Sequence, residues 1–217
     1  MRFGYRNQLN SLKTRILDMG KFISTVLYDT ISVVQLQDIS LAKKINEDSD
    51  ISKMGRDIES TCLKIVSLQS PFASDLRVVT GYLKIITDLE RIAAQCAEIC
   101  EIVCMNNLVK GKCLNSTVSI LQKVFDIYNR TCDACYSLDV DEARKIYKAD
   151  DEVDADFSDI IFDISNSISN SEFSVCSGTD LMFIAKYAER MCDHCVNISK
   201  WIVYIDVGFF PDKNFFK

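Results

Sequence analysis

One short stretch of the sequence, AERMCDHCVNI at residues 188–198, combines several residue types that can do chemistry. It holds acids, a base, two thiols in CxxC spacing and the one histidine of the chain. Carboxylates and imidazole can bind a metal ion, and a CxxC pair can bind zinc or act in redox exchange. The same residues also fit the buried face of a helix, because free cysteine packs as a small hydrophobe. The elements around the stretch must decide between these uses.

The composition indicates a globular protein built of long helices. The chain has 217 residues, of which 48% are hydrophobic and 26% charged, and it holds only 2 Pro and 7 Gly to break helices. A net charge of −6 argues against nonspecific nucleic-acid binding, which needs clustered cations. We find neither a secretory signal nor an apolar stretch long enough to span a membrane. We therefore expect a cytoplasmic protein whose ten cysteines are mostly reduced thiols.

Apolar residues recur at helical spacing along most of the chain. Pro71 interrupts this pattern and Ser74 is a suitable N-cap for the helix that follows, while Gly111 marks a link between two halves. A polar loop rich in Ser and Asn covers residues 165–179. The spacing predicts six helices, at about residues 3–34, 38–68, 75–104, 115–138, 141–167 and 179–206.

The two halves carry related motifs. ERIAAQCAEI at 90–99 aligns without gaps to ERMCDHCVNI at 189–198, and Glu, Arg, Cys and Ile coincide. A weaker match relates LAKKINEDSDI to EARKIYKADDEV, earlier in each half. This repeat predicts an all-α fold of two tandem three-helix bundles. We expect the bundles at residues 1–108 and 114–208, followed by an aromatic tail at 209–217.

These motifs resemble those of the PhoU family of phosphate-signalling regulators. In that family, counterparts of QSPFASDLRVV, DLERI and ERMCDHCVNI recur within two tandem three-helix bundles. The resemblance covers nearly the whole chain. The last motif agrees with the family pattern at Glu189, Arg190, Asp193, His194, Asn197 and Ile198.

The resemblance implies a non-enzymatic accessory protein of a phosphate-specific transport system, located in the cytoplasm. Such a protein is a negative regulator of phosphate uptake and of the phosphate-starvation response. The implied partners are the ATPase subunit of a phosphate ABC transporter, a sensor histidine kinase and a second copy in a homodimer. No nucleic acid is implied, and the membrane is reached only through the transporter. Composition and spacing alone indicate none of these properties.

The resemblance also implies a metal site, because family members bind metal through paired acid-xxx-Asp motifs on neighbouring helices. Asp150 with Asp154 matches one motif, and Glu189 with Asp193 matches the other. Each pair places two carboxylates one turn apart, about 5–6 Å between Cβ atoms. A cation between the helices would offset their repulsion. We expect these four residues to bind an iron, Mg, Mn or Zn ion or cluster, with oxygen ligands favouring the first three over zinc.

The first half departs from this pattern. Ala94 stands where the family has Asp, and Ser52 lies near the position equivalent to Asp154. We therefore expect metal in the second bundle only. Glu90 lies in an apolar stripe, where an unpaired charge costs several kcal/mol. It is explained either by an ion pair from another helix or by a rival function, a metal-dependent helical-bundle enzyme with Glu90, Glu189 and Asp193 as ligands. A metal-free scaffold of the same fold is a further alternative.

The other reactive side chains favour structural roles. His194 lacks the Glu-x-x-His spacing of carboxylate di-iron bundles, and a hydrogen-bonded structural residue is the commoner case. The CxxC pairs, Cys132 with Cys135 and Cys192 with Cys195, both lie inside helical patterns, which favours packing over zinc or redox chemistry. No catalytic motif, such as a glycine-rich phosphate loop or GxSxG, occurs in the sequence.

Two segments complete the expectations. In QSPFASDLR we expect a helix-helix turn, in which Arg77 pairs with an acid of a neighbouring helix. The tail, VGFFPDKNFFK, carries four Phe residues after Gly208. The sequence leaves open whether it folds back onto the bundle or presents a patch for a partner.

Overall fold

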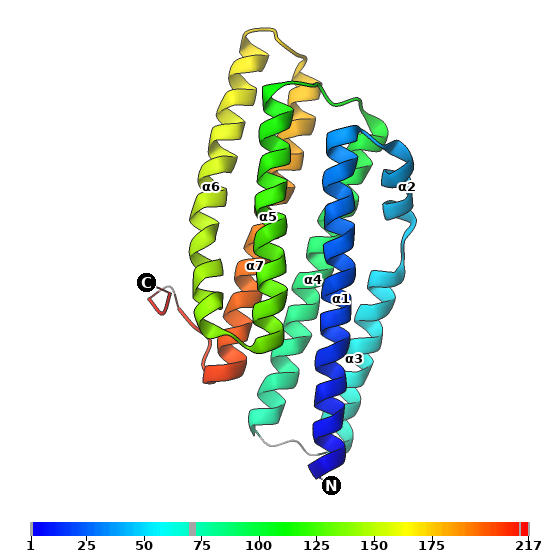
Figure 1. The fold of residues 1–217 in the computed structure, drawn as a ribbon, viewed down its shortest axis with the longest axis vertical. Coiled ribbons are helices and arrows are strands. Elements are labelled where there is room, and N and C mark those ends of the chain that lie inside the picture. Colours follow the sequence, from blue (N-terminus) through cyan, green and yellow to red (C-terminus); the bar gives the residue numbers. More distant parts are fainter. Residues whose placement is uncertain (1, 70–72, 213, 217) are drawn as a thin grey trace.

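The computed structural model describes residues 2–69, 73–212 and 214–216, and these ranges form seven helices and no strand. The helices are α1 (Arg2–Leu36), α2 (Ile39–Glu47), α3 (Asp50–Gln69), α4 (Ala73–Met105), α5 (Lys112–Ser137), α6 (Val140–Ser169) and α7 (Val175–Val207). They form two bundles side by side, one of α1 to α4 and one of α5 to α7 (Figure 1). The all-α fold of two tandem bundles is thereby confirmed. In the part of the chain described, no helix has the length and apolarity needed to cross a membrane.

The predicted helix at 38–68 is wrong at one point, because the structure divides it into α2 and α3. Asp38 is the N-cap of α2, and its side chain accepts hydrogen bonds from two backbone N–H groups of the first turn. Asp48 Oδ1 accepts from the N–H of Asp50 at 2.8 Å, where α3 begins. Short acidic side chains of this kind compete with helix continuation and favour a new cap. The two shorter helices together occupy the place of one long helix (Figure 1).

The predicted loop before the last helix is longer than the observed one. α6 extends to Ser169, and α7 already begins at Val175, so much of the predicted loop at 165–179 is helical. Ser174 sets the start of α7, because its Oγ accepts a hydrogen bond from the N–H of Ser177 at 3.1 Å. The end of the loop is therefore determined by the Ser174 N-cap and not by the whole run of polar residues.

The QSPFASDLR segment leads into α4, and its last residue, Arg77, contacts the second bundle. α4 begins one residue before Ser74, which therefore lies in the first turn rather than at the N-cap, while Pro71 lies outside the described residues. The expected ion pair of Arg77 is replaced by another contact. Its Nε donates to the carbonyl oxygen of Ile205 at 3.0 Å, and its Nη2 donates to that of Asp206 at 3.4 Å. Arg77 thus caps the carboxyl end of α7 from the first bundle.

The two bundles share one core. Buried apolar side chains from all seven helices belong to a single packed cluster. α4 lies antiparallel to α7, and α1 lies antiparallel to α5 (Figure 1). Across the second of these contacts, the Tyr128 hydroxyl donates to the carbonyl oxygen of Gly20 at 2.9 Å, and Ser24 Oγ donates to Asn129 Oδ1 at 2.6 Å. The repeats therefore pack as halves of one body.

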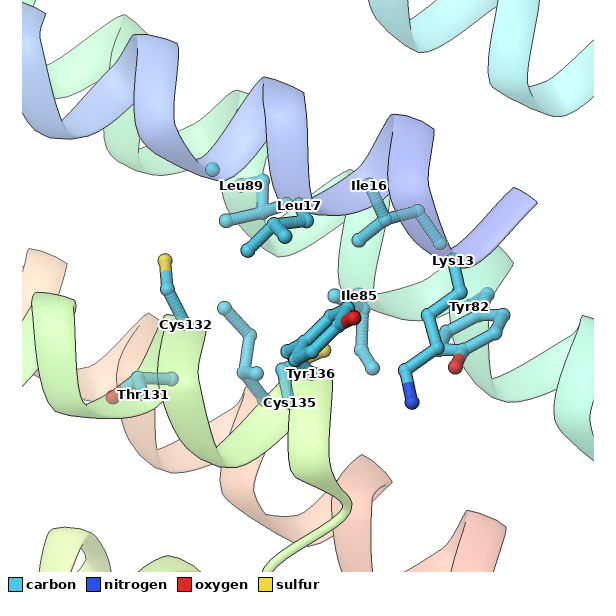
Figure 2. A pocket seen from close by; sticks show the side chains of 12 residues that line it. Lys13, Ile16, Leu17, Tyr82, Ile85, Leu89, Thr131, Cys132, Cys135 and Tyr136 are labelled. Carbon is cyan, nitrogen blue, oxygen red and sulfur yellow. The ribbon is translucent and has the colours of Figure 1, made fainter. Parts of the chain in front are cut away.

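A narrow cavity lies at this junction, between α1, α4, α5 and α7 (Figure 2). Its walls are mostly apolar, with Lys13 at one side, where its ammonium lies 4.5 Å from the centre of the Tyr136 ring. The cavity offers about 20 Å³, which is room for about one water molecule. Small-molecule sites are typically an order of magnitude larger, about 300–1,000 Å³. The space between the bundles is therefore a packing defect rather than a ligand pocket.

The tail folds back onto the second bundle, which answers the question the sequence left open. α7 ends where Gly208 adopts a left-handed conformation with φ 99°, and its N–H donates to the carbonyl oxygen of Tyr204. The chain then turns along α6 and α7 (Figure 1). Phe216 is only 2% exposed and stacks on Tyr147 with ring centroids 4.1 Å apart.

Candidate functional site

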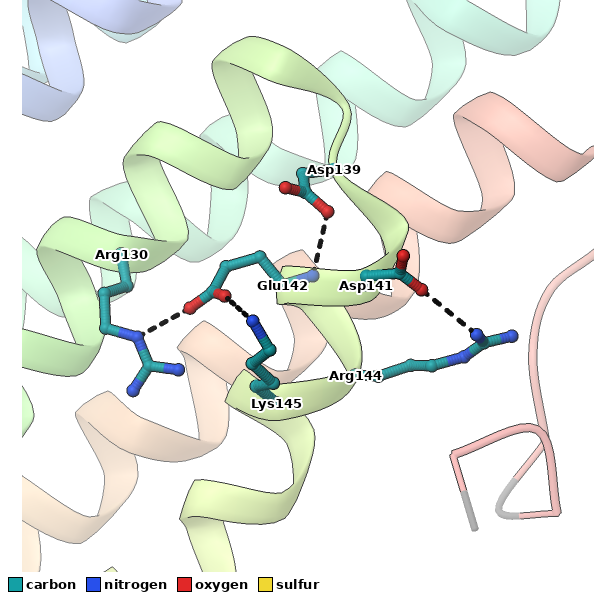
Figure 3. A network of polar contacts seen from close by, with 6 residues as sticks. All are labelled: Arg130, Asp139, Asp141, Glu142, Arg144 and Lys145. Atoms are coloured by element: carbon teal, nitrogen blue, oxygen red, sulfur yellow. Dashed lines mark hydrogen bonds and ion pairs between the residues drawn. The ribbon is translucent and has the colours of Figure 1, made fainter.

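A charged network fixes the beginning of α6, the helix that carries two of the predicted metal ligands (Figure 3). Asp139 is the N-cap, and its Oδ1 accepts from the N–H of Glu142 at 2.9 Å. The Glu142 carboxylate binds Lys145 at 3.0 Å and Arg130 of α5 at 2.7 Å. Hydrogen bonds from Lys145 and then Arg130 lower the pKa of Glu142. This network ties α6 to α5 and thereby sets the position of Asp150 further along α6.

Asp150 is half-buried, and its Oδ1 is buried without a hydrogen-bond partner. The pKa of this carboxyl group is raised from 3.8 to about 6. Burial is the main cause, a hydrogen bond with the Cys192 thiol opposes it, and nearby negative charge adds to it. That negative charge comes from Asp154, Asp193 and Glu189. The four acids predicted from two separate motifs therefore do gather in one region between α6 and α7.

Glu189 reaches this region from α7 and already has a cation beside it. Lys186, one turn earlier, places its Nζ 2.7 Å from Glu189 Oε2, and the Glu189 side chain is 13% exposed. The same oxygen is buried without a hydrogen bond, so the contact is an ion pair rather than a well-directed bond. The lysine supplies part of the positive charge that a metal ion would bring.

The fit of these residues to a metal ion is partial. Asp154 and Asp193 are exposed, and among the described residues no three His, Cys, Asp or Glu side chains converge as a ligand set. Two features suit a cation nonetheless. The buried oxygens Asp150 Oδ1 and Glu189 Oε2 lack hydrogen bonds, and bound positive charge would relieve the repulsion between the acids. The four-ligand site stays a prediction.

The corresponding glutamate of the first bundle has different surroundings. Glu90 of α4 is directed at α3, where its carboxylate fills the space that a Cβ atom on Gly55 would need. Burial raises the pKa of Glu90, and Glu59 raises it further, whereas the Arg56 guanidinium lowers it. Ala94, one turn along α4, is exposed and offers no second carboxylate. The first bundle therefore sets a cationic side chain near its glutamate and lacks the paired acid.

His194 joins the two bundles. Its Nδ1 lies 2.8 Å from Asp88 Oδ1, which bridges α7 and α4, and the two side chains are 18% and 13% exposed. This contact confirms the expectation of a hydrogen-bonded structural histidine. Although His194 directly follows the predicted ligand Asp193 in the sequence, its ring contacts Asp88 of the first bundle.

With this geometry in view, comparisons with known proteins decide the family. The model of the PhoU domain matches residues 16–103 and again residues 117–202. The chain belongs to the PhoU family. One match falls in each bundle, so the resemblance drawn from the motifs and the internal repeat are both confirmed.

PhoU relatives cover nearly the whole chain. The phosphate-specific transport system accessory proteins PhoU of Serratia marcescens and Escherichia coli K12 are each 30% identical over 94% of this chain, and over 85% and 86% of their own length. The PhoU homolog of Clostridium acetobutylicum is 28% identical over 97% of both chains. Crystal structures of PhoU from Streptococcus pneumoniae and Pseudomonas aeruginosa, each 22% identical, superpose with a TM-score of 0.89 over 96% and 94% of this chain. They have the same fold.

The CxxC thiols of this PhoU chain pack in the core, as the sequence predicts. Burial raises the pKa of Cys132 to about 11 and that of Cys135 to about 12. It also raises the pKa of Cys192 and Cys195, whose side chains are fully buried. Zinc binding and disulfide exchange require the thiolate, which these sites disfavour. All ten cysteines are free thiols.

The sequence does not predict the contacts of three residues in and around the site. Lys186 stands three residues before Glu189, and this spacing on a helix is a readable signal for an ion pair. Cys192 and Asp88 gave no such signal, because their partners Asp150 and His194 lie far away in sequence. Only the packing of α7 against α6 and α4 brings them together.

Proposed function

We propose that this chain is an accessory protein of a phosphate-specific transport system that restrains phosphate uptake and the phosphate-starvation response. The observation that carries this proposal is the match of both bundles to the PhoU domain, at 16–103 and 117–202. Relatives of that name align over 94% of the chain and 85% of their own length. The proposal therefore draws on proteins of comparable extent rather than on an isolated module.

Its action would consist of protein contacts in the cytoplasm. The proposed partners are the ATPase subunit of a phosphate ABC transporter and a sensor histidine kinase, and the proposed acting form is a homodimer. The accessory role in the names of the relatives supports a non-enzymatic protein. Two antiparallel bundles also offer long helical faces, which suit binding to flat protein surfaces (Figure 1).

The second bundle would add one metal site. We propose that Asp150, Asp154, Glu189 and Asp193 hold iron, Mg, Mn or Zn, whose chemical contribution when bound is positive charge. The orphaned Asp150 Oδ1 and the mutual repulsion of the acids support this. The residues would hold α6 and α7 in a fixed relation and neutralise an acidic face. Without a paired acid at Ala94, the first bundle is not expected to bind a second ion.

The alternative of a metal-dependent enzyme built on Glu90, Glu189 and Asp193 is not favoured. Glu90 packs against α3 at Gly55, in the first bundle, whereas Glu189 lies near Asp150 of α6. The relatives are named for an accessory role in transport. The other alternative is a metal-free scaffold of the same fold. Elemental analysis that finds no metal in the purified chain would support it.

The function is tested in a strain that lacks this protein. At high phosphate, we expect faster uptake of labelled phosphate and active starvation genes, both reversed when the intact chain is supplied. As a matched control, the exposed Phe162 is changed to Ala, which should restore repression fully. Unchanged uptake and unchanged gene expression in the deletion strain would contradict the proposal.

The partner and the metal are tested with purified protein. The transporter ATPase subunit should retain this chain on a column at physiological salt, and elemental analysis should find one metal site per chain. Equal occupancy of two sites per chain would contradict the confinement to the second bundle. Failure to bind the ATPase subunit would contradict the proposed partner while leaving the family assignment unchanged.

A further inference from the structure

The C-terminal segment from Gly208 to Phe216, which we call the tail, lies beyond the PhoU match that ends at residue 202. A turn at Asp212 shapes it, since Asp212 Oδ1 accepts the N–H of Asn214 at 3.0 Å and that of Phe215 at 3.1 Å. The turn separates two Phe pairs, at 209–210 and 215–216. The tail is therefore a compact element of its own rather than a frayed helix end.

The tail packs on a surface of α6 and α7 that we define by Arg144, Tyr147, Lys200 and Trp201 and call the tail groove. Phe216 stacks on Tyr147 with an interplanar angle of 6°. Phe215 lies 4.5 Å from Arg144 Cζ, in a cation–π contact. Phe210 meets the Trp201 ring edge-on at 4.8 Å. Three aromatic anchors thus seat the tail, each on a different groove residue.

These anchors are all ring contacts. Among the described residues of the tail, the hydrogen bonds beyond the Gly208 cap stay within it, around Asp212, and none joins it to α6. Phe209 and Phe210 remain 49% and 52% exposed. Aromatic pairs add stabilisation beyond the burial of their surface. A ligand with similar rings can therefore compete for the groove without breaking a backbone ladder.

The groove also holds a donor that the tail leaves unused. Arg144 extends from α6 toward the C-terminal segment (Figure 3), and its Nη1 pairs with Asp141 at 3.3 Å. Its Nε is buried without a hydrogen-bond partner. The Lys200 ammonium lies 5.6 Å from the Tyr147 ring centre, which adds a second cation. A carboxylate beside an aromatic pair would satisfy Arg144, and two cations favour such an acidic ligand.

We propose that the tail groove is a docking site for a partner segment that carries an aromatic pair next to a carboxylate, and that the tail occupies this site in the free protein. The chemistry of the occupant follows from the tail itself, whose Phe pairs the groove already accepts, and from the unpaired Nε of Arg144. The tail lies beyond the PhoU match, and neither the tail nor the four groove residues, which lie within that match, belong to the predicted metal ligands, so the inference stands apart from the proposed function.

The experiment uses the one tryptophan of the chain, Trp201, as a reporter. Two opened forms are made, Phe216→Ala in the full chain and a chain ending at Gly208, with Phe162→Ala as the control for loss of a Phe on α6. The probes are a peptide of residues 208–216 and the same peptide extended by one Glu. Binding is followed by Trp201 fluorescence, and folding is checked by helical circular dichroism.

We expect both opened forms to change Trp201 emission and to bind the tail peptide at least tenfold more tightly than the intact chain or Phe162→Ala. The Glu-extended peptide should bind about threefold more tightly still, and Arg144→Lys should remove that gain. If the shortened chain fails to fold, Phe216→Ala gives the same readout.

Three results would overturn the proposal. One is equal affinity of the opened and intact forms, and another is equal binding of a scrambled peptide. The third is a dimer of the intact chain that Phe216→Ala abolishes, since the occupant would then be the tail of a second copy.

Discussion

Glu90 and Glu189 occupy the same place in the two repeats, yet their surroundings differ. Glu90 rests on Gly55 and is flanked by Glu59 and Arg56. Glu189 faces the acids of α6 and is paired with Lys186. The motif places a glutamate at the same helical position in both bundles, but its neighbours differ, both on its own helix and on the helix packed against it. Repetition of a motif therefore does not imply repetition of a site.

The junction between the bundles repeats this asymmetry. His194 corresponds to Gln95 in the alignment of the two ER motifs, and Asp88 corresponds to Tyr187. The His194–Asp88 contact thus has no equivalent pair, and Gln95 is buried with its Oε1 lacking a partner. The polar contacts at this point of the junction therefore differ between the two halves, since Tyr187 donates instead to Glu98 Oε2 at 3.3 Å.

The largest expected difference between the two glutamates is in metal affinity. Loss of an outer partner of a metal ligand already costs about 10–100-fold in affinity. We therefore expect Glu189→Gln to weaken Mn²⁺ binding at least tenfold in calorimetric titration. Glu90→Gln is the matched control and should bind as the original chain does. Equal weakening by both substitutions would contradict a site confined to the second bundle.

Asp88→Ala should cost about 2 kcal/mol of unfolding free energy, because it leaves His194 half-buried without its partner. Denaturant titration measures the loss, and the exposed Asp126→Ala should cost little. The double variant with His194→Ala should cost less than the sum of the single losses. Additive losses would mean that the contact does not couple the bundles.

Asp150→Asn should flatten part of the pH dependence of stability. The pKa of Asp150 is higher in the folded chain, about 6 against 3.8, so the folded state binds the proton more tightly. The contribution of Asp150 to the free energy of unfolding therefore falls as pH rises from about 4 to 6. Above that window the whole destabilisation by the buried charge is present. At pH 7.5 in chelator, the variant should gain about 1 kcal/mol, a value reduced for partial exposure. At pH 4 the two proteins should be equal.

Glu90→Gln should give the smallest change, a gain in stability at neutral pH that is smaller than the gain of Asp150→Asn. Burial and Glu59 raise the pKa of Glu90, but Arg56 opposes them, so less repulsion is removed than at Asp150. The amide keeps the shape that fits over Gly55. Thermal unfolding of both variants side by side measures the difference, and a larger gain at Glu90 would reverse the comparison.

Much of the fold could be predicted because helical spacing is local information. The repeat of the ER motifs then gave the number of bundles. The break between α2 and α3 was missed although a signal existed. The apolar stripe steps six residues from Ile45 to Ile51, and acidic capping residues stand between them. The prediction of one helix at 38–68 treats the apolar stripe as continuous, although its spacing changes at this step.

The site was harder to predict than the fold. Only the family resemblance predicts that Asp150 and Glu189 lie together, and in the structure the two are in one region. The sequence gives no sign that Cys192 lies beside Asp150 or that Asp88 contacts His194, since both depend on how helices rotate against one another. The tail was equally undecidable, because Phe residues fit a folded-back segment and a partner patch alike.

Arg77 has a consequence for how the halves depend on each other. It closes the last turn of α7 from the first bundle, through the carbonyl groups of Ile205 and Asp206. During synthesis the donor leaves the ribosome long before its acceptors exist, so this contact forms only after α7 has been made. The carboxyl-terminal half has no such helper when made alone. The two repeats are therefore not interchangeable modules, because the end of the second depends on a side chain of the first.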